Sequence, residues 1–119
     1  MQGFIHLIDT DSKSKVGDYQ LLYGMEETKA DVYDIVPVQK QGHYAVGTKR
    51  GLFIISITRV NGSQWDFQII HRDFNDINVT PINQIRALAY TMDTSLLIGF
   101  QKEQNLYLYN YETKDKNRM

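Results

Sequence analysis

The chain has three histidines, His6, His43 and His71, and no cysteine, so few side chains are suited to catalysis or to binding a transition metal. Acid–base catalysis and metal binding both require histidines to converge with carboxylates at a fixed geometry. The sequence contains no His-x-x-x-His pair and no glutamate close to a histidine. We therefore expect ordinary strand or surface histidines, no catalytic residue, no metal site and no cofactor.

A glycine-flanked basic segment, Gly-Thr-Lys-Arg-Gly at residues 47–51, invites comparison with a phosphate-binding loop. Such a loop requires Gly-x-x-x-x-Gly-Lys-Ser/Thr and a following helix, whose N-terminus supplies amide donors. Here the segment leads into residues 52–57, a continuous apolar run that is typical of a buried strand. The segment is predicted to be a hairpin turn with solvated basic side chains.

Tyr107, Tyr109 and Tyr111 alternate along an expected strand, which directs all three rings to one face. A ladder of this kind can stack on single-stranded RNA only beside a basic groove. Lysine and arginine do not cluster around it, and 13 basic against 14 acidic residues give a formal charge of −1. We expect no nucleic-acid binding, and we expect the rings to pack between sheets.

The 119 residues fit one domain, and a hydrophobic fraction of 42% argues against disorder. No apolar run approaches the roughly 18 residues of a membrane span, and the N-terminus lacks the basic start of a signal peptide. These features predict a soluble chain without a membrane span, located in the cytoplasm.

The sequence contains an internal repeat of about fifty residues, which is the range of propeller blades. Asp-Tyr-Gln-Leu-Leu at residues 18–22 returns 48 positions later as Asp-Phe-Gln-Ile-Ile. In a second register, Tyr-Ala-Val-Gly ending at Gly47 resembles Leu-Leu-Ile-Gly ending at Gly99, 52 positions later.

Each repeat is built from short strands and turns. One contiguous unit has four predicted strands, at residues 32–38, 43–47, 52–57 and 65–71. Parts of neighbouring units are predicted at residues 4–8, 18–23, 85–90, 95–100 and 105–111. No convincing helix is predicted, and the polar residues 113–119 are expected to be a frayed tail.

Two segments resemble known propeller families. Residues 85–99 resemble the first two strands of a WD-repeat blade, and residues 105–110 its third strand, with Tyr109-Asn110 in place of Trp-Asp. Residues 42–55 are similar to the Gly-Thr-x-x-Gly-Leu pattern of two-component-regulator propellers and citron-homology domains. The resemblance implies a β-propeller, a fold that these families use mostly as a platform for binding proteins.

The predicted fold is therefore all-β, with antiparallel four-stranded blades of a β-propeller, about two blades being present. The propeller segment would span residues 1–112, as blade parts 1–23, 32–71 and 84–111, with a β-sandwich as the alternative. Because two blades cannot close a ring, their apolar faces need a cover. We expect a fragment of a longer chain or a subunit of an assembly.

The predicted function is a non-catalytic scaffold for protein–protein interaction, or an assembly component, whose partners are other proteins or the remaining blades of a longer chain. The alternative is a ligand-sensing propeller segment of a signalling protein. On a propeller, the loops that follow the second and fourth strands share one face. The residues expected to contact partners there are Lys49, Arg50, Arg72, Asp73 and Lys102.

Overall fold

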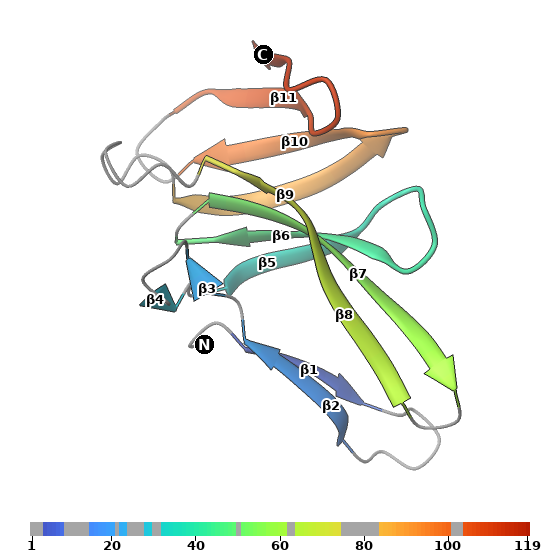
Figure 1. Ribbon diagram of the computed structural model, residues 1–119. Helices are drawn as coiled ribbons and strands as arrows, with labels where there is room; N and C mark the ends of the chain where they lie inside the picture. The colour runs from blue at the N-terminus through green and yellow to red at the C-terminus, as the bar shows by residue number, and fades with distance from the viewer. Residues whose placement is uncertain are drawn as a thin grey trace.

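The computed structural model describes residues 4–8, 15–20, 22–23, 28–29, 32–49, 51–61, 64–74, 84–100 and 104–119. These residues form twelve strands and no helix (Figure 1), so the prediction of an all-β chain is confirmed. In the part of the chain that is described, no helix is long and apolar enough to cross a membrane.

Two four-stranded antiparallel sheets make up most of the molecule, and in each of them the strands lie in chain order. The central sheet consists of β5 (Val32–Pro37), β6 (His43–Thr48), β7 (Gly51–Asn61) and β8 (Gln64–Asp73). The C-terminal sheet consists of β9 (Ile85–Met92), β10 (Ser95–Phe100), β11 (Leu106–Asn110) and β12 (Lys116–Arg118).

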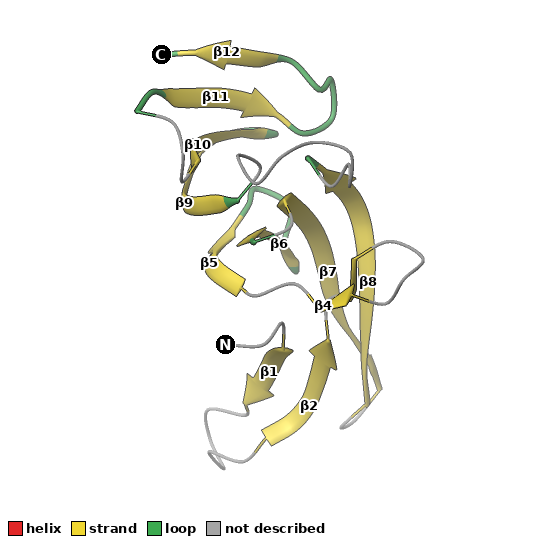
Figure 2. Ribbon diagram, turned by 90° about the vertical axis from the view of Figure 1, so that its left-hand side faces the viewer, coloured by secondary structure: helices red, strands yellow, loops and turns green. Residues whose placement is uncertain are grey.

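The N-terminal part of the chain adds two short hairpins, of β1 (Phe4–Ile8) with β2 (Lys15–Gln20), and of β3 (Leu22–Tyr23) with β4 (Thr28–Lys29). The strand predicted at residues 18–23 is wrong as a single element. Residues 15–20 pair with β1, whereas residues 22–23 pair with β4. In Figure 2, β1 and β2 lie at the opposite end of the molecule from the C-terminal sheet.

The frayed tail predicted at residues 113–119 is also wrong, because β12 pairs with β11 and completes the C-terminal sheet. Asn110 closes the turn between the two strands: its side-chain oxygen accepts hydrogen bonds from the backbone N–H groups of Glu112 and Thr113. Lys114 takes a positive φ of 70°, and its N–H donates to the Asn110 carbonyl at 2.8 Å.

The two large sheets pack face to face, with their first strands β5 and β9 side by side. Asp34 on β5 accepts a hydrogen bond from the Leu88 backbone N–H at 2.9 Å, and the Arg86 guanidinium lies 4.3 Å from the Tyr33 ring centroid. Ile85 is fully buried at this contact. Buried residues of both sheets therefore form one shared core, which lies between the sheets and includes Ile85.

The tyrosine ladder on β11 faces this core, as predicted. Tyr109 and Tyr111 are buried, and Tyr107 packs against the same cluster. The Phe74 ring lies 4.8 Å from Tyr109, and the Phe100 ring lies 5.6 Å from Tyr107. The aromatic rings therefore fill the space between the sheets.

The other face of the central sheet is also covered. Val46, Phe53 and Ile55 are at most 1% exposed and form a second apolar cluster. Residues 51–56 of β7 are buried without interruption, which agrees with the prediction of a strand buried on both faces. The central sheet is thus the middle layer of the fold.

Candidate functional site

The five residues predicted to contact partners are only partly within the described structure. Lys49 is exposed in the turn between β6 and β7, and Arg72 is exposed on β8, whereas Arg50 and Lys102 lie outside the described residues. The predicted hairpin is present: Gly51 has a φ of 107°, and the Thr48 hydroxyl donates to its carbonyl at 2.9 Å. An added Cβ at Gly51 would lie 2.5 Å from the Asp73 carbonyl oxygen, so this turn abuts the end of β8.

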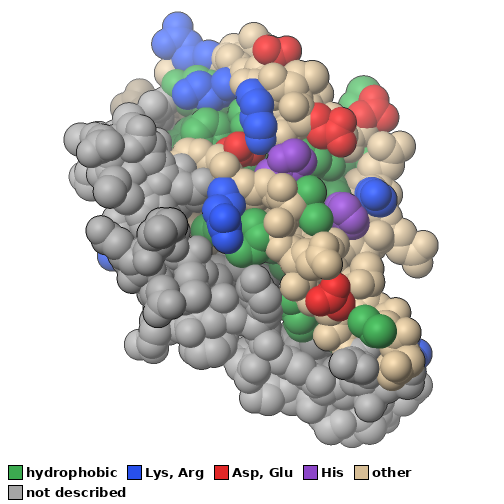
Figure 3. All heavy atoms as spheres, in the orientation of Figure 1, with side chains coloured by type: hydrophobic (Ala, Val, Ile, Leu, Met, Phe, Trp, Pro, Cys, Tyr) green, Lys and Arg blue, Asp and Glu red, His purple; other side chains and the backbone are tan. Residues whose placement is uncertain are grey.

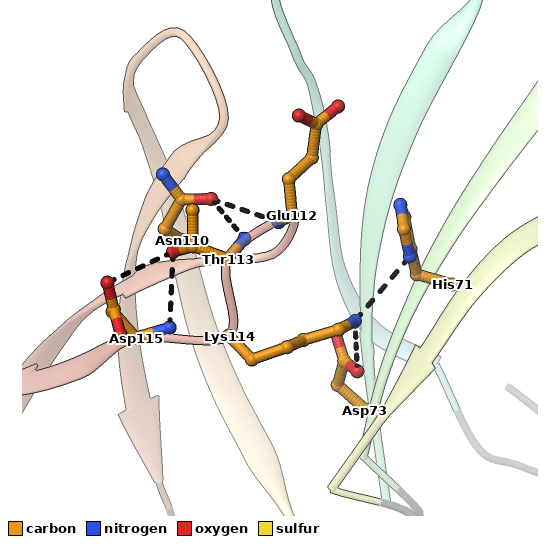
Figure 4. Close-up of polar contacts among 7 residues, drawn as sticks. All are labelled: His71, Asp73, Asn110, Glu112, Thr113, Lys114 and Asp115. Carbon is orange, nitrogen blue, oxygen red and sulfur yellow. Dashed lines mark hydrogen bonds and ion pairs between the residues drawn. The ribbon is translucent and has the colours of Figure 1, made fainter.

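Asp73 forms an ion pair that links the two sheets (Figure 4). The Lys114 ammonium lies 2.7 Å from Asp73 Oδ1 and 3.5 Å from His71 Nδ1. The Asp73 side chain is 10% exposed and that of Lys114 is 47% exposed. The carboxylate that was predicted to meet a partner is therefore engaged within the chain.

The position of Lys114 follows from the Asn110 turn. Besides the two backbone N–H groups, the Asn110 side-chain oxygen accepts the Thr94 hydroxyl at 2.9 Å, which ties the β9–β10 turn to the β11–β12 turn. The Tyr111 N–H donates to the Thr94 carbonyl at 3.0 Å. Both turns are thereby held together, and Lys114 is directed toward β8.

Tyr109 packs beside this ion pair and is kept protonated. Burial, and secondly its interaction with the Asp73 carboxylate, raises the pKa of the Tyr109 phenol well above its usual range. A phenol with a raised pKa is a poor general base near neutral pH. The arrangement of Asp73, Lys114 and Tyr109 is therefore suited to joining the sheets rather than to proton transfer.

A cleft of about 300 Å³ opens between the sheets on the face shown in Figure 3, where histidine side chains lie beside acidic and basic ones. Lys40, His43 and His71 of the central sheet line one side of it. Asp93 and Glu112 of the C-terminal sheet line the other. The two walls therefore carry groups of opposite charge.

The electrostatics of the cleft favour a neutral His43. Burial, followed by the nearby Lys40 and His71, lowers the pKa of the His43 imidazole from its usual 6.5. The His71 and Tyr111 rings lie 5.7 Å apart at the same cleft. Sequence reasoning described His43 and His71 as separate strand residues, because only the pairing of β6, β7 and β8 brings them to one cleft.

The C-terminal sheet has a second face that is turned away from the central sheet, here called the open face. Strand pairing places on its middle the apolar residues Ala87, Ala89, Leu97, Gly99, Leu106 and Leu108, and on its margins the polar residues Ser95, Asn110 and Asn117. Leu106 is 49% exposed, whereas Leu96 and Ile98 on the inner face are fully buried. The middle of the open face is thus apolar, with Ala87, Ala89 and Leu106 exposed on it.

No protein-family model matches the chain, and no curated protein does so either. Within the described ranges, no three histidine and acidic side chains are grouped in a way that could hold a metal ion.

Proposed function

We propose that the chain is a non-catalytic scaffold for protein–protein interaction, or an assembly component, built on WD-repeat-like propeller blades. The observation that carries this proposal is the open face. The side chains in the middle of this face are alanine, leucine and glycine, although Leu106 is 49% exposed and Ala87 and Ala89 are also exposed. Exposed apolar residues gathered on one face of a sheet are typical of protein interaction sites.

The strand order is one support for the proposal of propeller blades. Each four-stranded sheet has its strands in chain order, which is the arrangement of a propeller blade. The two first strands, β5 and β9, are also neighbours, as they are around the axis of a propeller. The Greek-key connections that are typical of sandwiches are not found among the described strands.

The test is the mass of the isolated chain in solution, measured by sedimentation equilibrium at increasing concentration. With its open face uncovered, the chain is expected to self-associate. Leu106→Lys should reduce this association at least tenfold, because it places a charge in the middle of the apolar face.

The matched control is Val60→Lys. Val60 is 59% exposed on the β7–β8 hairpin, which lies away from the C-terminal sheet (Figure 1). The control should associate like the unmodified chain. A chain that stays monomeric at all concentrations, or a Val60→Lys variant with the same effect as Leu106→Lys, contradicts the proposal.

The cleft supports a second candidate function, a ligand-sensing propeller segment. Its volume of about 300 Å³ is at the lower limit of small-molecule sites, which span roughly 300–1,000 Å³. Its basic and acidic walls favour a small zwitterion such as a free amino acid. Titration with the twenty free amino acids, followed by NMR shifts of the His43 and His71 rings, tests it; unchanged shifts would exclude this candidate.

A further inference from the structure

Gly47 shows how the two sheets of this molecule fit together. A Cβ added at Gly47 would lie 2.7 Å from Ile85 Cγ2 and 3.3 Å from both Ile85 Cβ and Leu88 Cδ1. Contacts this short are not compatible with the packing seen, and Ile85 is fully buried. The missing side chain at Gly47 is therefore what allows Ile85 of the C-terminal sheet to pack onto the central sheet.

The side of the central sheet that packs on the C-terminal sheet is here called the covered face. The open face of the C-terminal sheet has the same pattern of cross-strand pairs. On the covered face the cross-strand pairs are Gly47 with Asp34 and Leu52, and Ala45 with Val36 and Ile54. On the open face they are Gly99 with Ala87 and Leu106, and Leu97 with Ala89 and Leu108. Gly99 thus occupies the position of Gly47, one sheet further along the chain.

Gly99 has no steric function within the described structure. A Cβ added there would lie 3.4 Å from Leu106 Cδ2 and 3.7 Å from Ala87 Cβ, which are ordinary contacts. Its φ is not in the left-handed region, where only Gly42 and Gly51 are found among the described glycines. Glycine inside a strand weakens the strand, and it often marks a place where another segment approaches closely.

We propose that the open face docks a partner protein that presents a further four-stranded antiparallel sheet of the same repeat, with a branched aliphatic side chain that packs on Gly99 as Ile85 packs on Gly47. This inference rests on the proposed function and names the kind of partner. The partner's contacting surface is expected to resemble the inner face of the C-terminal sheet. Its apolar residues are Ile85, Leu88, Leu96 and Ile98.

One feature of the covered interface has no counterpart on the open face. Asp34 accepts a hydrogen bond from the Leu88 backbone N–H, but Ala87 takes the Asp34 position on the open face. The backbone N–H of the partner that corresponds to the Leu88 N–H must therefore find another acceptor. The contact with the partner is thus expected to be more apolar than the contact between the two sheets. A partner that offers a charged residue opposite Gly99 is excluded, because an unpaired charge there would be buried.

The test supplies the expected partner from the chain itself. The full chain is extended after Met119 by a second copy of residues 75–119, which brings a second Ile85 to the position opposite Gly99. We expect the added sheet to be protected from hydrogen exchange, by at least tenfold over the same extension carrying Ile85→Asp in the second copy.

Gly99→Val in the first copy is the discriminating variant. It should leave the unextended chain folded, because the added atoms face away from the core, and it should abolish the protection of the added sheet. An added sheet that stays unprotected, or whose protection survives Gly99→Val, overturns the inference. If the added sheet fails to dock while Leu106→Lys still abolishes association of the unextended chain, the proposed function stands and only this partner class is wrong.

Discussion

Gly47 and Gly99 occupy equivalent positions in two successive sheets, but their surroundings differ. Gly47 is buried beneath Ile85, whereas Gly99 is only partly buried on the open face. The strand pairs around the two glycines follow the same pattern. Pairing within the sheet therefore does not explain why glycine is needed at either position. What packs on the sheet explains Gly47, and by the same reasoning it predicts a partner for Gly99.

The two faces also differ in the kind of interaction that they use. The covered face combines apolar packing with the hydrogen bond from the Leu88 N–H to Asp34 and the ion pair between Asp73 and Lys114. The open face offers apolar side chains in its middle, around Gly99, with Ser95, Asn110 and Asn117 toward its margins. The contact between the two sheets thus uses polar groups as well as apolar packing, whereas the proposed contact at the open face would depend mainly on apolar packing.

Substitution of the two glycines is expected to affect stability very differently. Gly47→Val should destabilise the chain by about 3 kcal/mol, because it overpacks the contact with Ile85. Gly99→Val should change the unfolding free energy by about 1 kcal/mol or less, in the stabilising direction, since a strand glycine is replaced without a clash. Urea denaturation of both variants measures this, and losses of equal size would refute the contrast between the two faces.

A smaller effect is expected at the ion pair that joins the sheets. Lys114→Met keeps the aliphatic stem but leaves the mostly buried Asp73 carboxylate unpaired, which should cost about 1–3 kcal/mol. Lys49→Met, at an exposed turn position, is the control and should stay within about 0.5 kcal/mol of the unmodified chain. If both substitutions have the same effect on the urea midpoint, Lys114 does not hold the sheets together.

The smallest effect concerns pH. Because the pKa of folded His43 is lowered from 6.5, the unfolded chain takes up the proton first as the pH falls. The contribution of His43 is therefore fully present above about pH 6.5 and is lost as the pH falls from there toward its folded pKa.

The measurement is the urea midpoint at pH 8 and at pH 5.5. The drop between them should be smaller in His43→Gln than in the unmodified chain, in which Lys40 and His71 also face the cleft opposite Asp93 and Glu112. The same drop in both proteins, or a midpoint that rises toward pH 5.5, would show that His43 does not titrate as described.

Sequence reasoning predicted the strands well where apolar and turn residues alternate clearly. Residues 4–8 and 95–100 form strands with the predicted limits, and the Gly51 hairpin has the expected positive φ. It missed β12 because the turn before it depends on the Asn110 side chain and on a positive φ at Lys114, a residue type that does not signal a turn.

The site was less predictable than the strands. The repeat paired Gly47 with Gly99, but the reason for a glycine at either position becomes visible only when Ile85 is placed across the sheet interface. Asp73 was expected at a partner surface, and the structure pairs it with Lys114, which is 41 residues away in the chain. Contacts between sheets follow from strand register and packing, which local sequence patterns do not encode.

Whether Gly99 receives a partner is tested by the unfolding free energy of Gly99→Ala, measured in the unextended chain and in the chain extended by a second copy of residues 75–119. Alanine should stabilise the unextended chain by about 0.5–1 kcal/mol, because a strand glycine is removed. In the extended chain it should instead destabilise the added sheet, since its methyl group takes the space of the second Ile85. Stabilisation of similar size in both proteins would contradict the claim that Gly99 is there to receive a partner.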